Sequence, residues 1–159
     1  MKKVTILMAL MISAAMMMSI ISCDDDDTNG PEIKPDAKAR IEGAINLDFE
    51  GFSSTFSQEQ INYDITSKYI CTMDKDGNTY KLMFEYNDYF EEMTYDLVTG
   101  SVKASFTINN TTVYDQIVDG ELNVDTKEGS ELDAHFGFIA TSKSTSDTVY
   151  ITGGEISHD

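Results

Sequence analysis

Residues 132–140 read Leu-Asp-Ala-His-Phe-Gly-Phe-Ile-Ala, and every second residue from Leu132 to Phe138 is apolar. This alternation is typical of a half-buried β-strand, because successive side chains of a strand point to opposite faces. The same pattern recurs elsewhere in the chain. It is found at residues 41–49, 80–86, 102–108, 122–124 and 149–151.

Clusters of turn-forming residues separate these segments. They are residues 74–78, 99–100, 109–112, 127–130 and 142–147. One helical turn would fit between residues 58 and 65, but Ile61, Tyr63 and Ile65 fit a strand better. Several short strands at this spacing predict an all-β, antiparallel β-sandwich, with a small calycin-like β-barrel as the alternative.

The N-terminus has the pattern of a secretory signal. Lys2 and Lys3 precede an apolar run of 18 residues from Val4 to Ile21. A short basic segment followed by an apolar one predicts a signal peptide over residues 1–22. The alternative is an uncleaved membrane helix, since a run of this length can just span a bilayer.

The end of this run, Ile20-Ile21-Ser22-Cys23, resembles the lipobox of bacterial lipoproteins. The resemblance implies that Cys23 is lipidated and becomes the first residue of the mature protein, which makes the membrane a partner through the lipid. Two or more acyl chains hold a protein stably at a membrane. We therefore expect a durable lipid anchor.

Residues 23–38 are predicted to form an acidic, flexible tether, because they are rich in Asp, Asn, Gly and Pro and contain one large apolar residue, Ile33. The folded domain is then residues 39–159. Similar acidic runs follow the lipidated cysteine of surface lipoproteins in the Bacteroidota, where they act as an export signal. The resemblance implies that Asp24, Asp25, Asp26 and Asp27 direct the protein to the outer membrane, facing the cell exterior. The alternatives are inner-membrane retention, which an aspartate after the cysteine signals in some other bacteria, and a merely solvated linker.

The charge of the chain limits its partners. It has 28 acidic and 11 basic residues, for a formal net charge of −17. Binding to nucleic acid depends on clustered Lys and Arg at phosphates, and here these residues are few and scattered. The sequence therefore predicts no nucleic-acid partner, whereas cationic ligands, divalent metals and neutral glycans remain open.

Three segments of the last third carry a resemblance to a family. A glycine-led strand at 120–124 precedes an aromatic-x-aromatic strand around Phe136-Gly137-Phe138, and the strand from Val149 ends in Thr152-Gly153-Gly154. Residues 118–156 resemble a family of small β-sandwich surface lipoproteins of the Bacteroidota. The resemblance implies a fold and a surface address. It implies no catalytic residue, because the family has no established activity.

Residues suited to catalysis are few. Histidine occurs twice, and His135 is expected on a strand surface and His158 near a mobile C-terminus. A pair of carboxylates can act without histidine, but acids are so abundant that no pair stands out. We therefore expect a non-enzyme without a cofactor. Cys71 alternates with Tyr69 and Met73 and is expected to pack in the core.

A weak calcium pattern occurs at residues 74–85. Positions one, three, five and twelve of a calcium loop correspond to Asp74, Asp76, Asn78 and Glu85, but the glycine expected at position six is Thr79. A β-hairpin turn at Asp76-Gly77 explains the same residues, because this pair adopts the positive φ angles of tight turns. We favour the turn and expect no metal.

The segment 86–95 is the predicted recognition loop. It combines rings with a carboxylate, the chemistry that binds sugars, in Tyr86, Asp88, Tyr89, Phe90 and Tyr95. The alternative is that two or three of these aromatic side chains fold back onto the end of the sandwich.

One modification site is also expected. Asp147-Thr148-Val149 resembles the acceptor of protein O-glycosylation in the Bacteroidota, and it follows a polar stretch. The resemblance implies a glycan on Thr148. The alternative is a threonine present for its strand propensity.

Together these features predict a lipid-anchored, non-catalytic surface lipoprotein with a binding or accessory role on a glycan or a surface protein. One alternative is a structural or adhesin subunit that pairs through a sheet edge. Another is a calycin-like barrel that encloses an apolar ligand.

Overall fold

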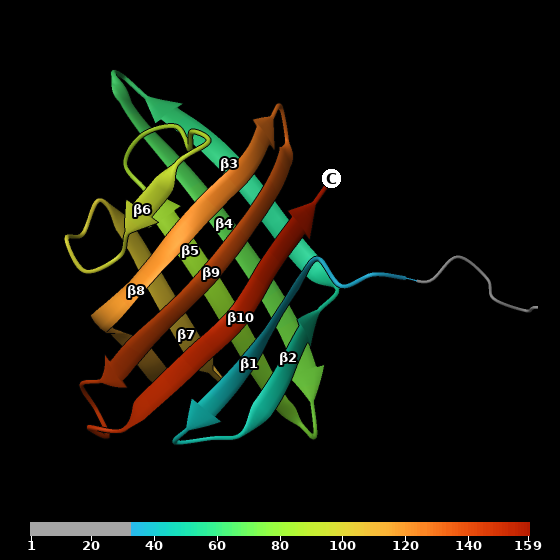
Figure 1. Cartoon of the computed structure of the whole chain (residues 1–159), viewed down its shortest axis with the longest axis vertical. Coiled ribbons are helices and arrows are strands. Elements are labelled where there is room, and N and C mark those ends of the chain that lie inside the picture. Colours follow the sequence, from blue (N-terminus) through green and yellow to red (C-terminus); the bar gives the residue numbers. More distant parts are fainter. Residues whose placement is uncertain (1–32) are drawn as a thin grey trace, which may run out of the picture. The chain divides into compact units, whose positions relative to one another are not determined.

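The computed structural model describes residues 33–159, and within this range it contains ten strands and no helix (Figure 1). The strands are β1 (Ala37–Gly43), β2 (Leu47–Gly51), β3 (Ser53–Ile61), β4 (Asp64–Lys75), β5 (Asn78–Tyr86), β6 (Thr94–Asp96), β7 (Val102–Ile108), β8 (Thr112–Glu128), β9 (Glu131–Ser142) and β10 (Thr148–His158). The predicted signal peptide, Cys23 and Asp24 to Asp27 lie outside the described residues. Within residues 33–159, no helix is long and apolar enough to cross a membrane.

All strand pairs are antiparallel and belong to one sheet, in the order β2-β1-β10-β9-β8-β7-β5-β4-β3, with β6 added to β8. This confirms the predicted all-β, antiparallel fold. Most neighbours in the sheet are also neighbours in sequence and are joined by hairpins. That connectivity explains why a local alternation of apolar residues was enough to predict the fold class.

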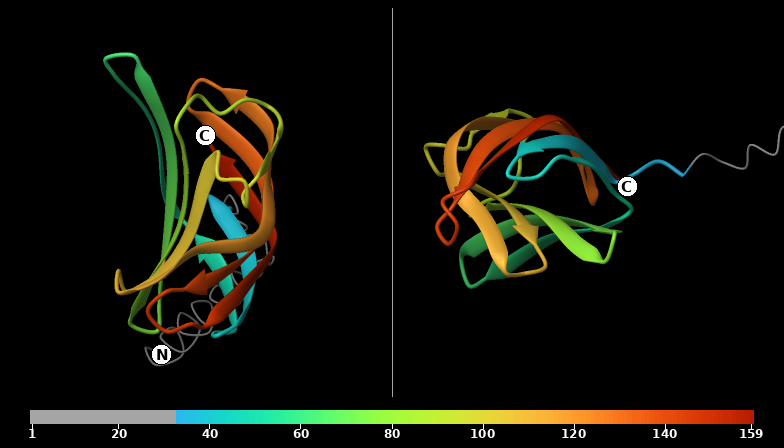
Figure 2. Two further views of the ribbon diagram at one scale, coloured as in Figure 1. Left: turned by 90° about the vertical axis from the view of Figure 1, so that its left-hand side faces the viewer. Right: turned by 90° about the horizontal axis from the view of Figure 1, so that it is seen from below.

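The sheet curls until it is nearly closed. Its two end strands, β2 and β3, are consecutive in the chain and are separated only by Phe52. The first pairs with β1 and the second with β4, so one bent stretch joins the two ends of the sheet. Seen end-on, the two walls face each other like the layers of a sandwich, while the strand order is that of a barrel (Figure 2).

One continuous hydrophobic cluster occupies the space between the walls. Its rings meet edge to face, with the Phe84 centroid 5.1 Å from Phe136 and 6.1 Å from Phe138. Burial raises the pKa of the Cys71 thiol to about 11, and this residue lies in the core as expected. The side chains of this cluster occupy the interior of the curled sheet.

One hairpin confirms a predicted turn, and another shows that a predicted strand is wrong. The turn at Asp76-Gly77 has φ angles of 52° and 77° and joins β4 to β5, as predicted. Residues 41–49 were expected to form one strand, and this is wrong. The chain reverses after Gly43, at a φ of 106°, so that Ile41 pairs with Leu47 and the period of two continues across the turn.

Side chains from three segments meet where β3 passes the ends of β1 and β10, a place that we call the seam. Ser54 Oγ donates to Asp36 Oδ2 at 2.8 Å and lies 2.6 Å from His158 Nδ1. The His158 ring packs against Tyr69, with centroids 5.9 Å apart. The expectation of a mobile His158 is therefore wrong. Because β1 begins at Ala37, which is buried, the fold also starts two residues before the predicted boundary at 39.

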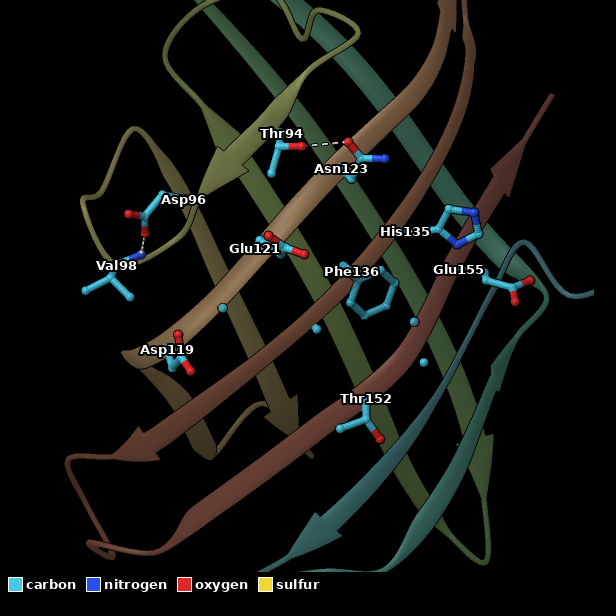
Figure 3. A pocket seen from close by; sticks show the side chains of 14 residues that line it. Thr94, Asp96, Val98, Asp119, Glu121, Asn123, His135, Phe136, Thr152 and Glu155 are labelled. Atoms are coloured by element: carbon cyan, nitrogen blue, oxygen red, sulfur yellow. Dashed lines mark hydrogen bonds between the residues drawn. The ribbon is translucent and has the colours of Figure 1, made fainter.

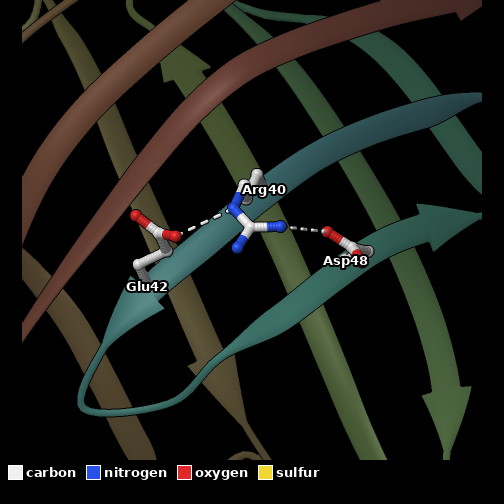
Figure 4. Close-up of polar contacts among 3 residues, drawn as sticks. All are labelled: Arg40, Glu42 and Asp48. Atoms are coloured by element: carbon white, nitrogen blue, oxygen red, sulfur yellow. Dashed lines mark hydrogen bonds and ion pairs between the residues drawn. The ribbon is translucent and has the colours of Figure 1, made fainter.

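Arg40 on β1 forms one surface ion pair within its own strand and one with the neighbouring strand. Arg40 Nε lies 2.8 Å from Glu42 Oε1, and Arg40 Nη1 lies 3.3 Å from Asp48 Oδ1 on β2 (Figure 4). All three side chains are exposed, and exposed pairs contribute little to stability.

Candidate functional site

An open groove of about 1030 Å³ lies on the outer face of β8, β9 and β10, beside β6 (Figure 3). Its lining comes from all four strands and from the turn after β6. The lining residues are Thr94, Asp96, Val98, Asp119, Gly120, Glu121, Asn123, His135, Phe136, Gly137, Thr152, Gly153, Gly154 and Glu155.

Two local features make this surface concave. A curled sheet is convex outside, so a hollow needs a raised rim or missing side chains. The rim is β6, which pairs with the middle of β8 and brings Thr94, Asp96 and Val98 to one side. The centre of the hollow lacks side chains, because Gly137 faces it from β9 and Gly153 from an irregularity in β10.

A chain of polar contacts orders one end of the groove. Thr94 Oγ1 donates to Asn123 Oδ1 at 2.8 Å, and Asn123 Nδ2 donates to Asp125 Oδ1 at 2.7 Å. Asp125 Oδ2 lies 3.4 Å from His135 Nε2 on the neighbouring strand. These contacts hold an amide and an imidazole at fixed positions in the lining of the groove.

The groove is acidic. Asp96 Oδ1 accepts the backbone N–H of Val98, and Glu155 pairs with Lys38 at 2.7 Å. Asp119 and Glu121 have no ion-pair partner among the described residues. No Lys or Arg is among the residues that line the groove. The site therefore offers acceptors for O–H and N–H groups and repels anions.

The predicted recognition loop does not form one exposed surface. Phe90 and Tyr95 are buried, at 3% and 4% exposure, and their ring centroids lie 5.7 Å apart. Tyr86 is half-buried and packs against both rings. Of the five residues predicted to bind, only Asp88 and Tyr89 are exposed. The alternative interpretation, aromatic side chains folded back onto the end of the domain, describes these three rings.

The structure separates the residues of the weak calcium pattern. Asp74 pairs across the hairpin with Thr79 and accepts its hydroxyl, whereas Glu85 lies six residues further along β5. At about 3.4 Å per residue this separation is on the order of 20 Å. Glu85 instead lies between Lys68 and Lys103. Within residues 33–159, no three His, Cys, Asp or Glu side chains are grouped to hold a metal.

Thr148 is the first residue of β10 and is half-buried, directly after the loop that ends at Asp147. Its carbonyl accepts the N–H of Ala44 at 2.9 Å, which fixes the backbone at this position. The glycan expected there stays a prediction.

None of the residues that line the groove was predicted as a site from the sequence, and Glu121, Asn123 and Gly137 show why. These three residues lie on the polar face of β8 and β9, whereas the alternation that identifies the strands is defined by their apolar face. A signal was present, since Gly137 interrupts the strand between two phenylalanines, where a glycine weakens a sheet. The pairing of β6 with β8, which builds the rim, has no local sequence signal.

Comparison with known proteins found no matching family model, no similar curated protein and no similar solved structure.

Proposed function

We propose that this chain is a lipid-anchored, non-catalytic surface lipoprotein whose β domain binds a glycan. The observation that carries the binding role is the groove on β8, β9 and β10, which at about 1030 Å³ is larger than the hollow of about 390 Å³ beside β7. Concave surfaces with a few converging polar groups are the usual sites of ligands. The sequence supports the anchor through Cys23 and the surface address through Asp24 to Asp27.

The chemistry of the groove favours a polyhydroxylated ligand. Carboxylates, an amide, an imidazole and two threonine hydroxyls line the hollow, and Val98 and Phe136 are the large apolar residues beside them. Such groups bond sugar hydroxyls, and Asn123 and His135 are already oriented by their neighbours. An apolar ligand would leave these polar groups without partners at a free-energy cost.

The binding role is tested on a glycan array with the full-length protein in detergent. Asn123→Ala and Glu121→Ala should each weaken binding by about tenfold, because each removes hydrogen bonds worth about 1.5 kcal/mol. Glu59→Ala, on the distant β3, serves as the control for lost charge and should bind like the wild type. Equal binding by all three variants would place the site elsewhere.

The anchor is tested by Cys23→Ser. This variant should accumulate as an unprocessed precursor and leave the detergent phase in a phase-partitioning assay. Protease added to intact cells should remove the wild-type domain, and replacing Asp24 to Asp27 with Ala should protect it. A Cys23→Ser protein that partitions normally, or a protected wild type, would contradict the anchor or the surface address.

A second function, as an assembly subunit, is favoured by one observation. Beyond Phe56, β3 has a free edge, its pairing with β4 is regular, and Ile61 and Tyr63 at the hairpin tip are exposed at 67% and 95%. Regular free edges invite pairing with another strand. Light scattering separates the two functions, since a subunit would be oligomeric and Gln58→Pro would return it to a monomer.

A further inference from the structure

Four glycines line the groove, and three of them are required by the fold. A Cβ on Gly120 would overlap Phe138, and one on Gly154 would overlap the ring of Phe136. Gly153 has a φ of 58°, a left-handed conformation that favours glycine. A side chain at any of these three positions would cause strain. The fold alone therefore explains these glycines, and they are no evidence for a ligand.

Gly137 is different, because nothing in the fold requires it. Its φ is not in the left-handed region, and an added Cβ would meet only the carbonyl oxygen of Ile151, at 3.4 Å, an ordinary contact. It lies in the middle of β9, where it pairs with Glu121 of β8. A glycine in the interior of a strand weakens the sheet and often marks a site where a ligand approaches the backbone closely.

The groove provides the place for such an approach. Gly137 lines it from β9, with Glu121 of β8 opposite on one side and the irregular stretch Thr152-Gly153 of β10 on the other. A side chain at 137 would fill the floor of the hollow, and the polar groups around it would lose access to a ligand that lies flat.

We propose that Gly137 is the floor of a saccharide subsite, on which a sugar ring lies against the peptide backbone while Glu121, Asn123 and His135 bond its hydroxyls. This inference deepens the proposed function and rests on it. The unpaired carboxylates of Asp119 and Glu121, with no Lys or Arg in the lining, further assign the subsite to neutral or amine-bearing sugars and against uronic acids.

The test compares Gly137→Ala and Gly137→Val with the wild type by calorimetry, using full-length protein in detergent at low salt. The probes are hexamers of glucose, N-acetylglucosamine, glucosamine and galacturonic acid. Thr141→Ile is the matched control, because it adds bulk to the outer face of the same strand outside the groove. Denaturation midpoints are measured for every variant.

The wild type and Thr141→Ile should bind at least one neutral or amine-bearing hexamer, and galacturonic acid at least tenfold more weakly. Gly137→Val should lose tenfold or more in affinity, and Gly137→Ala less, while both fold at least as stably as the wild type, because alanine and valine have higher strand propensity than glycine. If Gly137→Val destabilises the fold, Gly137→Ala alone decides the outcome.

Unchanged affinity in a folded Gly137 variant would overturn the assignment of Gly137 and leave the proposed function standing. Equal binding of galacturonic acid would overturn the charge selection. If the wild type binds none of the four hexamers, both the inference and the glycan-binding function fail.

Discussion

Phe90 and Tyr89 are adjacent aromatic residues with opposite roles. The Phe90 ring is buried between Phe56 and Tyr86, with centroids at 6.3 and 5.6 Å, whereas Tyr89 is 45% exposed. The loop is held in place by Tyr95, whose hydroxyl accepts the N–H of Glu91 at 2.7 Å and donates to its carbonyl. The Phe90 ring therefore closes the hydrophobic core at this end of the domain.

We expect Phe90→Ala to lower the free energy of unfolding by about 3–5 kcal/mol, the usual effect of truncating a buried ring. Tyr89→Ala should change it by less than about 0.5 kcal/mol, as exposed substitutions do. Urea denaturation measures both. A small effect at Phe90 would show that its ring is free, which would restore the loop as a recognition surface.

The contrast shows what sequence can predict at the scale of residues. The alternation through Phe136 and Phe138 is local, so the inward face of β9 could be read directly. The burial of Phe90 depends in part on Phe56, which is distant in the chain, and no local pattern reports that contact.

At the scale of elements, Glu85 of β5 ties three strands together. Its carboxylate lies 2.9 Å from Lys103 Nζ on β7 and 3.3 Å from Lys68 Nζ on β4. The hydrogen bond from Lys103 lowers the pKa of Glu85 most, and Lys68 lowers it further. This residue, the last position of the weak calcium pattern, forms an ion-pair bridge across neighbouring strands.

Glu85→Gln should destabilise the domain by about 1 kcal/mol at neutral pH, a value limited by partial exposure of the bridge. Because the pKa is depressed in the folded state, the contribution is present above the ordinary pKa of Glu, about 4.3, and is lost as pH falls through the folded value. The difference between wild type and variant should therefore shrink in acid. A difference that is constant from pH 7 to pH 3 would argue against the bridge.

Hairpins were predictable where a turn has a strong local signature, as at Asp76-Gly77. The error at 41–49 has a physical cause. The turn 44–46 continues the period of two, so the pattern does not report that the chain reverses. Only the left-handed φ of Gly43 marks the turn, and a lone glycine is a weak signal.

At the scale of the whole domain, side-chain contacts hold together the three segments that meet at the seam. Ser54, Asp36 and His158 come from the beginning of β3, the segment before β1 and the end of β10. Since Ser54 donates to Asp36, the Nδ1 of His158 must carry the hydrogen that Ser54 accepts. The ring also packs against Phe56 and Tyr69.

His158→Ala should lower the free energy of unfolding by about 1–3 kcal/mol, because it removes both the hydrogen bond and the ring contacts. Hydrogen exchange should increase first in β3 and at the start of β1, the segments that the seam joins. Exchange that rises equally in all strands would show that the seam is not a separate point of opening.

The strand order of the domain was not predictable from the pattern, since period two identifies strands without their partners. The placement of β6 against β8, and of β7 against β5, follows from packing between distant segments. The groove depends on that placement, and this is why its residues could not be predicted while the fold class could.

The most direct test of the central claim, that the groove on β8, β9 and β10 binds a saccharide, is chemical-shift mapping on isotope-labelled protein. Hexamers of glucose, N-acetylglucosamine and glucosamine are added in turn and backbone amide shifts are recorded. The account predicts that the shifts from a binding hexamer cluster at residues 94–96, 119–123, 135–137 and 152–155. Shifts confined to residues 86–93 or to the β3–β4 hairpin, or no shifts with any hexamer, would contradict it.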